Sequence, residues 1–157
     1  MSHRATHSLP GEGVRLNTVD SLATVKIGAA DTDGQYELFE IEAACGPGVP
    51  PHRHPWAEAY YLLEGALDVQ VGGKTLHLLP GASITVPPNA PHTMEVTSPK
   101  AKFLAFSLTG GTGQLFQDLD DTIPRGEPDA ATLALIVEVA GRNGVSFLGA
   151  PPAPTTA

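Results

Sequence analysis

With 157 residues, the chain has the size of one domain. It carries 9 basic and 17 acidic residues, a net charge of −8, and has no basic stripe that could bind nucleic acid or an anionic membrane. No apolar run approaches the roughly 20 residues of a membrane helix, and residues 1–10 lack the apolar stretch of a signal peptide. A single cysteine, Cys45, excludes an internal disulfide, so we expect a reducing, cytoplasmic location.

Short strands separated by turns are predicted over residues 22–108. The 17 glycines and 15 prolines favour many turns over long helices. Residues 36–43 alternate between apolar and acidic side chains, as a strand with one buried face does. The pair Gly72-Gly73 has the form of a two-residue hairpin loop. About eight such strands at intervals of 8–12 residues are typical of an antiparallel sandwich or barrel.

The segments that flank these strands have a different composition. Asp129 is a candidate helix cap, and the apolar residues behind it recur with helical spacing, which predicts a helix over residues 129–140 that packs on the barrel. The predicted organisation is a flexible N-terminal arm over residues 1–13, a barrel over residues 14–110, a helical extension packed on the barrel over residues 111–149, and a disordered, proline-rich tail over residues 150–157.

Side chains of the types that bind metals lie within residues 46–65. His52 and His54 are two apart, so on a strand they share one face and their imidazoles can converge on one ion. Glu58 begins the next strand, and His92 opens a later strand after a proline-rich turn. Three imidazoles and one carboxylate leave positions of an octahedral ion open, as catalytic metal sites do. A His-x-His pair alone also fits polar residues at an exposed strand end.

The full spacing is more specific than the histidine pair. It resembles the first motif of the cupin superfamily, which is a glycine, five residues, His-x-His, three or four residues, a glutamate, six residues and a glycine. Every fixed position of that motif is met here, by Gly46, His52, His54, Glu58 and Gly65.

Residues 81–96 resemble the second cupin motif. Gly81, Pro87 and His92 match it. Asn89 stands where the family has a glycine, a mild change because asparagine also tolerates positive φ. Val96 replaces an asparagine that is not a metal ligand in the family. The resemblance extends over residues 36–109, and the tail of the chain is similar to that of small single-domain cupins described as quercetinase-like.

The resemblance implies an all-β fold, an antiparallel jelly-roll β-barrel with a short C-terminal helical segment. It also implies that His52, His54, Glu58 and His92 hold one divalent metal ion, which would be Fe, Mn, Ni, Co, Cu or Zn. A small-molecule substrate and a homodimer are expected as well. The strand over residues 22–28 is a candidate for pairing across subunits, because an open edge strand is a liability.

Three functions are compatible with this ligand set. The first is a dioxygenase acting on a small aromatic or enol-type substrate, with Glu58 as ligand and catalytic proton acceptor. The second is a redox-neutral cyclase, isomerase or lyase, similar to polyketide cyclases. The third is a non-enzymatic cupin that binds a small molecule. Tyr60, Met94 and Phe106 are candidates for lining the substrate pocket, and equally for the barrel core. Trp56 is a candidate to shield the pocket mouth, and equally for packing at the surface.

Overall fold

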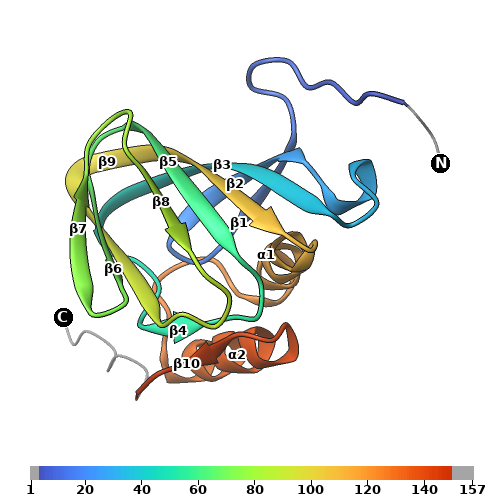
Figure 1. The fold of residues 1–157 in the computed structure, drawn as a ribbon. Coiled ribbons are helices and arrows are strands. Elements are labelled where there is room, and N and C mark those ends of the chain that lie inside the picture. Colours follow the sequence, from blue (N-terminus) through green and yellow to red (C-terminus); the bar gives the residue numbers. More distant parts are fainter. Residues whose placement is uncertain (1–3, 150–157) are drawn as a thin grey trace.

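A single hydrogen-bonded sheet, folded over on itself, forms most of the molecule (Figure 1). The computed structural model describes residues 4–149. The strands are β1 (Val14–Asn17), β2 (Ser21–Ile27), β3 (Tyr36–Pro47), β4 (His52–Arg53), β5 (Glu58–Glu64), β6 (Leu67–Val71), β7 (Lys74–Leu78), β8 (Ser83–Val86), β9 (His92–Leu108) and β10 (Ser146–Phe147). The helices are a 3-10 turn at Ala29–Asp31, α1 (Gly111–Thr122) and α2 (Ala130–Arg142).

The long strand β9 lies at the centre of the sheet and belongs to two layers. Its C-terminal half pairs with β3 on one side and β5 on the other, so that Leu104 faces both Glu40 and Tyr61. Its N-terminal end pairs with β4 and β6, so that His92 faces both His52 and Val71. Strands β1-β2-β3-β9-β5-β8 therefore form one layer, and β10-β4-β9-β6-β7 form the other.

This arrangement confirms the predicted all-β jelly roll with a short helical segment. Within residues 4–149, β7 and β8 are not hydrogen bonded to each other, so the two layers are joined through the bent strands β3 and β9. The hairpin predicted at Gly72-Gly73 is present, because Val71 pairs with Lys74 and both glycines have positive φ.

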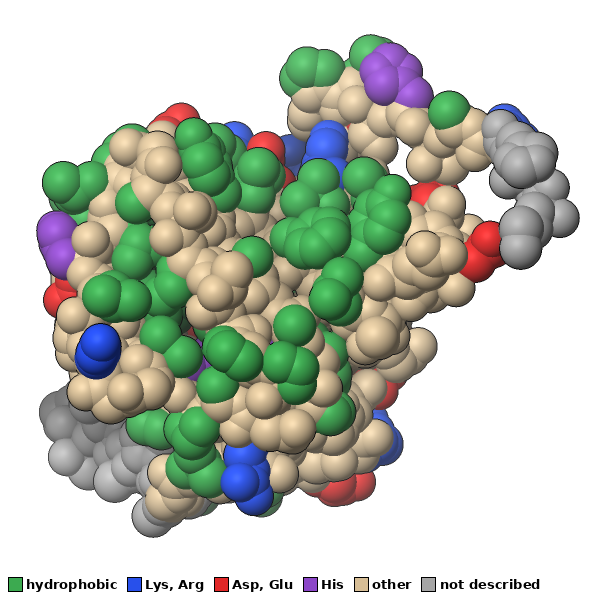
Figure 2. Space-filling view, in the orientation of Figure 1, with side chains coloured by type: hydrophobic (Ala, Val, Ile, Leu, Met, Phe, Trp, Pro, Cys, Tyr) green, Lys and Arg blue, Asp and Glu red, His purple; other side chains and the backbone are tan. Residues whose placement is uncertain are grey.

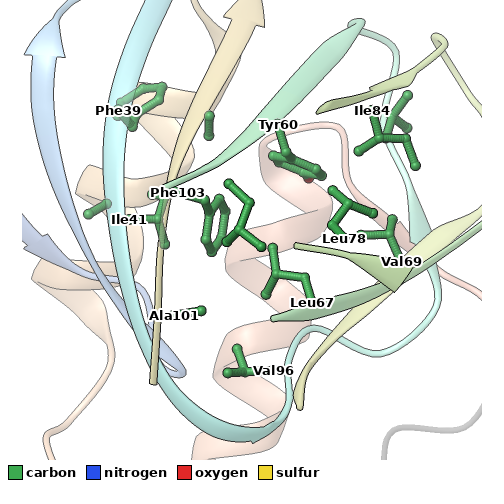
Figure 3. Packing of buried hydrophobic residues seen from close by; sticks show 14 residues of the cluster. Phe39, Ile41, Tyr60, Leu67, Val69, Leu78, Ile84, Val96, Ala101 and Phe103 are labelled. Atoms are coloured by element: carbon green, nitrogen blue, oxygen red, sulfur yellow. The ribbon is translucent and has the colours of Figure 1, made fainter. Parts of the chain in front are cut away.

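The space between the layers is filled by apolar side chains (Figure 3). On β3, Phe39 and Ile41 point inward and are buried, while Glu40 and Glu42 point outward, as the alternation predicts. Burying each such aliphatic or aromatic side chain contributes roughly 1.5–3 kcal/mol. The other buried members include Leu62, Leu67, Val69, Val86 and Phe103.

Strand β2 is not an open edge. Residues 14–17 form β1, which pairs with β2 along its length, while β3 pairs with its other side. The expectation that residues 22–28 pair across subunits is therefore wrong for this structure. The homodimer itself stays a prediction.

In Figure 1, α1 lies beside β1 and the end of β9, and α2 lies below β4. Phe116 of α1 packs edge-on against Phe39, with ring centroids 5.1 Å apart. The predicted cap of α2 is present, since the Thr132 amide donates to Asp129 Oδ1 at 2.8 Å. No helix among the described residues is long and apolar enough to cross a membrane. The predicted tail over residues 150–157 lies outside the described residues.

Replacing Gly65 by alanine is expected to destabilise the fold strongly. Gly65 has φ +85°, and a Cβ there would overlap the Lys100 carbonyl oxygen and lie 2.6 Å from Ser98 Oγ. We expect the free energy of unfolding to fall by about 3 kcal/mol or more. Gly73→Ala is the control, because Gly73 also has positive φ but open space around it. That variant should lose only about 1 kcal/mol. Equal losses in chemical denaturation would show that the steric overlap has no cost.

Candidate metal centre

Three histidines lie together at one end of the molecule. His52 is in β4, His54 follows that strand directly, and His92 is the first residue of β9 and pairs with His52. One nitrogen from each ring lies within 4.8 Å of the others. Two nitrogens bound to the same ion are at most about 4.2 Å apart, so a small inward movement brings all three within reach of one metal. His54 and His92 are buried, and His52 is partly exposed.

The main chain orients each of these rings. Nδ1 of His52 lies 3.0 Å from the Pro50 carbonyl oxygen, Nδ1 of His54 lies 2.9 Å from that of Trp56, and Nδ1 of His92 lies 2.8 Å from that of Ala90. A carbonyl accepts only, so each Nδ1 carries the proton. In the neutral ring Nε2 is then left with a free lone pair. Three such lone pairs form the donor set of a divalent transition metal, and ring orientation by outer partners is typical of metal sites.

Glu58 completes the cluster. Its Oε1 lies 3.2 Å from Nε2 of His54 and 3.1 Å from Nε2 of His92. The Tyr60 hydroxyl donates a hydrogen bond to the same oxygen. A carboxylate oxygen and two imidazole lone pairs are all acceptors, so a positive charge must lie among them. A proton supplies one such charge and a divalent metal ion supplies two, and the residues present therefore fit the metal.

The protonation states follow from the surroundings of each group. Burial lowers the pKa of His52 to about 4, and the charge of His92 adds to this effect. Burial alone would raise the pKa of Glu58, but in the protein without an ion the hydrogen bonds that Nε2–H of His54 and of His92 donate to it outweigh burial and hold that pKa well below its usual value. Burial and the neighbouring Glu58 raise the pKa of Tyr60 well above its ordinary value. At neutral pH, Glu58 is thus an anion and Tyr60 a neutral donor.

The three residues predicted to line the substrate pocket lie in different places. Tyr60 is buried beside Glu58. Met94 faces Val69 across the β6–β9 pair and packs against the core, on the same side of β9 as His92. Phe106 is 38% exposed on the outer face of the sheet. It is therefore not part of the proposed site.

The part of the outer face around Phe106 is apolar. Phe106 stacks on Tyr36, with ring centroids 5.6 Å apart, and Tyr61 and Leu108 are also exposed on this face. Figure 2 shows apolar side chains gathered there, over β5 and the end of β9. The strand parity that turns Phe106 outward turns its small neighbours Ala105 and Ser107 into the interior, where they are buried.

Asp20, in the turn between β1 and β2, lies close to Gly48 and Met94. A Cβ added to Gly48 would lie 3.2 Å from Asp20 Oδ2 and the same distance from Met94 Cγ. The charge of Asp20 adds to the raised pKa of Tyr60, after the effects of burial and Glu58. The sequence pattern does not point to this residue. No local signal marks it, because its position depends on where the β1–β2 turn meets the end of β3.

Two surface hollows lie away from the histidines. One, of about 420 Å³, is lined by charged and small residues where β3, β5 and β9 meet, and includes Glu42, Glu64 and Lys100. The other, of about 300 Å³, lies between β1, β2 and α1. Neither hollow includes any of the three histidines, so the chemistry of the site must be read from the histidines and Glu58.

Comparison with known proteins decides the family. A family model described as "Cupin domain" matches residues 39–107, which include the metal-site candidates. The chain carries a cupin domain over those residues. This cupin is 31% identical over 112 residues to a quercetin 2,3-dioxygenase of Bacillus subtilis (strain 168), and the match covers 71% of the chain. It spans about a third of the length of that relative, 33%.

Solved structures support the same fold. KdgF from Halomonas sp. superposes with a TM-score of 0.60 at 16% identity, over 68% of this cupin and 94% of that chain. The polyketide cyclase RemF from Streptomyces resistomycificus superposes with a TM-score of 0.55 at 24% identity, over 69% of this cupin and 80% of that chain. At these identities the likeness shows the fold alone, and the reaction must be argued from the site.

Proposed function

We propose that this cupin is a metal-dependent enzyme, a dioxygenase that acts on a small aromatic or enol-type substrate. The observation that carries the proposal is the set of three Nε2 lone pairs that face one another beside an ionised Glu58. The similarity to a quercetin 2,3-dioxygenase supports the choice of reaction class. The chain spans only a third of that relative, so the relative's activity and substrate class are assigned to this chain only as a proposal.

His52, His54, His92 and Glu58 would hold one divalent ion, and the mixed nitrogen and oxygen donors suit Fe, Mn, Co, Ni, Cu or Zn. When bound, such an ion supplies Lewis acidity and, if it is redox-active, an electron route between substrate and dioxygen. The backbone carbonyls that orient the rings keep the donor atoms facing inward before any ion arrives.

The protein's own part in the reaction is proton handling and the exclusion of water. Glu58 is an anion at neutral pH and can accept the proton of a phenol or enol hydroxyl placed beside it. Tyr60 keeps its proton and holds Glu58 Oε1 in place. Buried apolar residues around Tyr60, among them Leu62 and Val86, keep this end of the interior dry. His52, the partly exposed member of the cluster, marks the side from which a substrate approaches.

A redox-neutral reaction is the second candidate. The Tyr60–Glu58 pair places a neutral hydroxyl next to an ionised carboxylate. A cyclase, isomerase or lyase that moves one proton needs such a general acid and general base. In that case the metal, which can then be zinc, only polarises a carbonyl. The same residues serve both reactions, so experiment must separate them.

Oxygen uptake separates the two candidates. We expect metal-loaded protein to consume dioxygen with a flavonol or cyclic diketone, and to convert none of that substrate under strictly anaerobic conditions. Protein loaded with Zn²⁺, which has no redox chemistry, is the control and should show no uptake. Turnover of the same substrate without oxygen would overturn the dioxygenase and favour the redox-neutral enzyme. The homodimer and the cytoplasmic location stay predictions, and sedimentation measurements would test the first.

A further inference from the structure

Trp56 connects the metal-site candidates to the C-terminal part of the chain. Its indole stacks on the His54 imidazole, with ring centroids 4.3 Å apart and planes 9° from parallel. Its carbonyl oxygen accepts the hydrogen bond from His54 Nδ1. One residue therefore fixes both the tilt and the rotation of the His54 ring.

The C-terminal segment encloses the other side of Trp56. Ala140 of α2 and Val145 form a small buried cluster with the indole, and Leu115 and Phe147 pack against it. Gly111, at the start of α1, lies so close that a Cβ there would be 2.9 Å from the indole ring. Trp56 is only 6% exposed, and its Nε1–H has no hydrogen-bond partner among the described residues. The indole thus contributes through its packing surface.

Strand β10 attaches the same segment to a second histidine. Phe147 pairs with His52 and Ser146 pairs with Arg53, so β4 lies between β9 and β10. The Leu148 amide donates to the Pro51 carbonyl oxygen at 2.8 Å. Figure 1 shows β4, β10 and α2 side by side at the bottom of the molecule. The two-residue strand β4 is therefore held from outside by the last described part of the chain.

We propose that Trp56 is a positioning residue and that residues 130–148 act as a clasp that holds His54 and His52 in their ligand positions. The proposal rests on the proposed metal site. Its physical basis is linkage: a segment that stabilises the arrangement competent to bind metal must itself be stabilised when metal binds. Metal affinity and the docking of the clasp should consequently rise and fall together.

Co²⁺ titration of the full chain, followed by visible absorption, tests the role of Trp56. We expect Trp56→Ala to weaken Co²⁺ binding by about tenfold or more, which is the usual effect of removing a residue that orients a ligand. Trp56→Phe keeps an aromatic ring on His54 and loses only the unpaired N–H, so it should bind within about threefold of wild type. Val137→Ala, on the exposed side of α2, is the matched control and should bind as wild type does.

Phe147→Ala provides a second variant in case Trp56→Ala does not fold. It removes the side chain that β10 places beside His52 without emptying the main core, and should also weaken Co²⁺ binding. Hydrogen exchange measured by mass spectrometry with and without Zn²⁺ tests the reciprocal effect. We expect Zn²⁺ to slow exchange at the Val145 and Leu148 amides, and to slow it less in Trp56→Ala.

The outcomes separate this inference from the proposed function. Wild-type affinity in both Trp56→Ala and Phe147→Ala, with exchange at Val145 and Leu148 insensitive to Zn²⁺, would overturn the clasp while leaving the metal site intact. If wild type binds neither Co²⁺ nor Zn²⁺, the proposed metal site is wrong, and the clasp proposal, which rests on it, is wrong as well. Weaker binding in the Trp56→Ala and Phe147→Ala variants but not in Val137→Ala would support the clasp.

Discussion

Replacing His52 and His54 together by alanine is expected to remove stoichiometric metal from the protein. Two of the three Nε2 donors are then lost, and the remaining pair, His92 and Glu58, cannot hold a transition ion against a chelating buffer. We expect the bound metal to fall from about one ion per chain to less than about a tenth. The measurement is elemental analysis of purified protein after dialysis against the same metal-containing buffer.

His77→Ala is the matched control for the double variant. His77 lies on β7 at the surface, where its Nδ1 contacts Asp68 Oδ1, and it does not belong to the histidine cluster. Its removal should leave the metal content unchanged. Thermal unfolding gives a second measurement. An ion at a hundred times its dissociation constant stabilises the folded state by about 2.7 kcal/mol, and only wild type and His77→Ala should show this gain. Undiminished metal in the double variant would contradict the proposed site.

Glu58→Gln is expected to have the largest effect on turnover. The amide keeps the shape of the side chain and can still accept the hydrogen bond from Tyr60, but it carries no charge and cannot take a proton. Loss of a general base reduces the rate by about 10²–10⁴-fold. The three histidines are unchanged, so the variant should still bind metal, although less tightly.

Kinetics must be compared at equal metal loading, so that a lost ion is not mistaken for a lost base. The test is steady-state turnover of the substrate found in the oxygen-uptake experiments, with metal content measured on the same samples. Glu42→Gln is the control, because Glu42 points outward from β3 and contacts Lys102 at the surface. Full activity in Glu58→Gln at wild-type metal content would show that Glu58 does not move the proton.

The histidine cluster could be predicted from sequence because its spacing is local. His52 and His54 are fixed by one strand end, and the structure brings His92 opposite His52 as the paired motifs imply. Asn89 has φ +61°, in agreement with its place at a position where the family has glycine. The inward direction of Phe39 likewise follows from alternation with charged neighbours.

The elements that were missed depend on partners far away in the chain. Strand β10 has two residues and exists only because β4 offers it an edge. Strand β1 is short and mostly exposed, so it has no buried periodicity to detect. Hydrophobicity and position predict that Phe106 lies in the interior, but β9 turns Ala105 and Ser107 inward instead. When apolar residues occupy both faces of a strand, the pattern alone does not identify the inner one.

The carbonyl groups that orient the three rings have a consequence for how this protein can change. Because the acceptors at Pro50, Trp56 and Ala90 belong to the main chain, no substitution of a side chain deletes them. These three hydrogen bonds therefore survive mutations of the surrounding side chains. Substitution of a neighbouring side chain, such as that of Met94, leaves these acceptors in place. For protein engineering, this means that a library of variants can be built around the histidine cluster without loss of the main-chain acceptors that orient its rings.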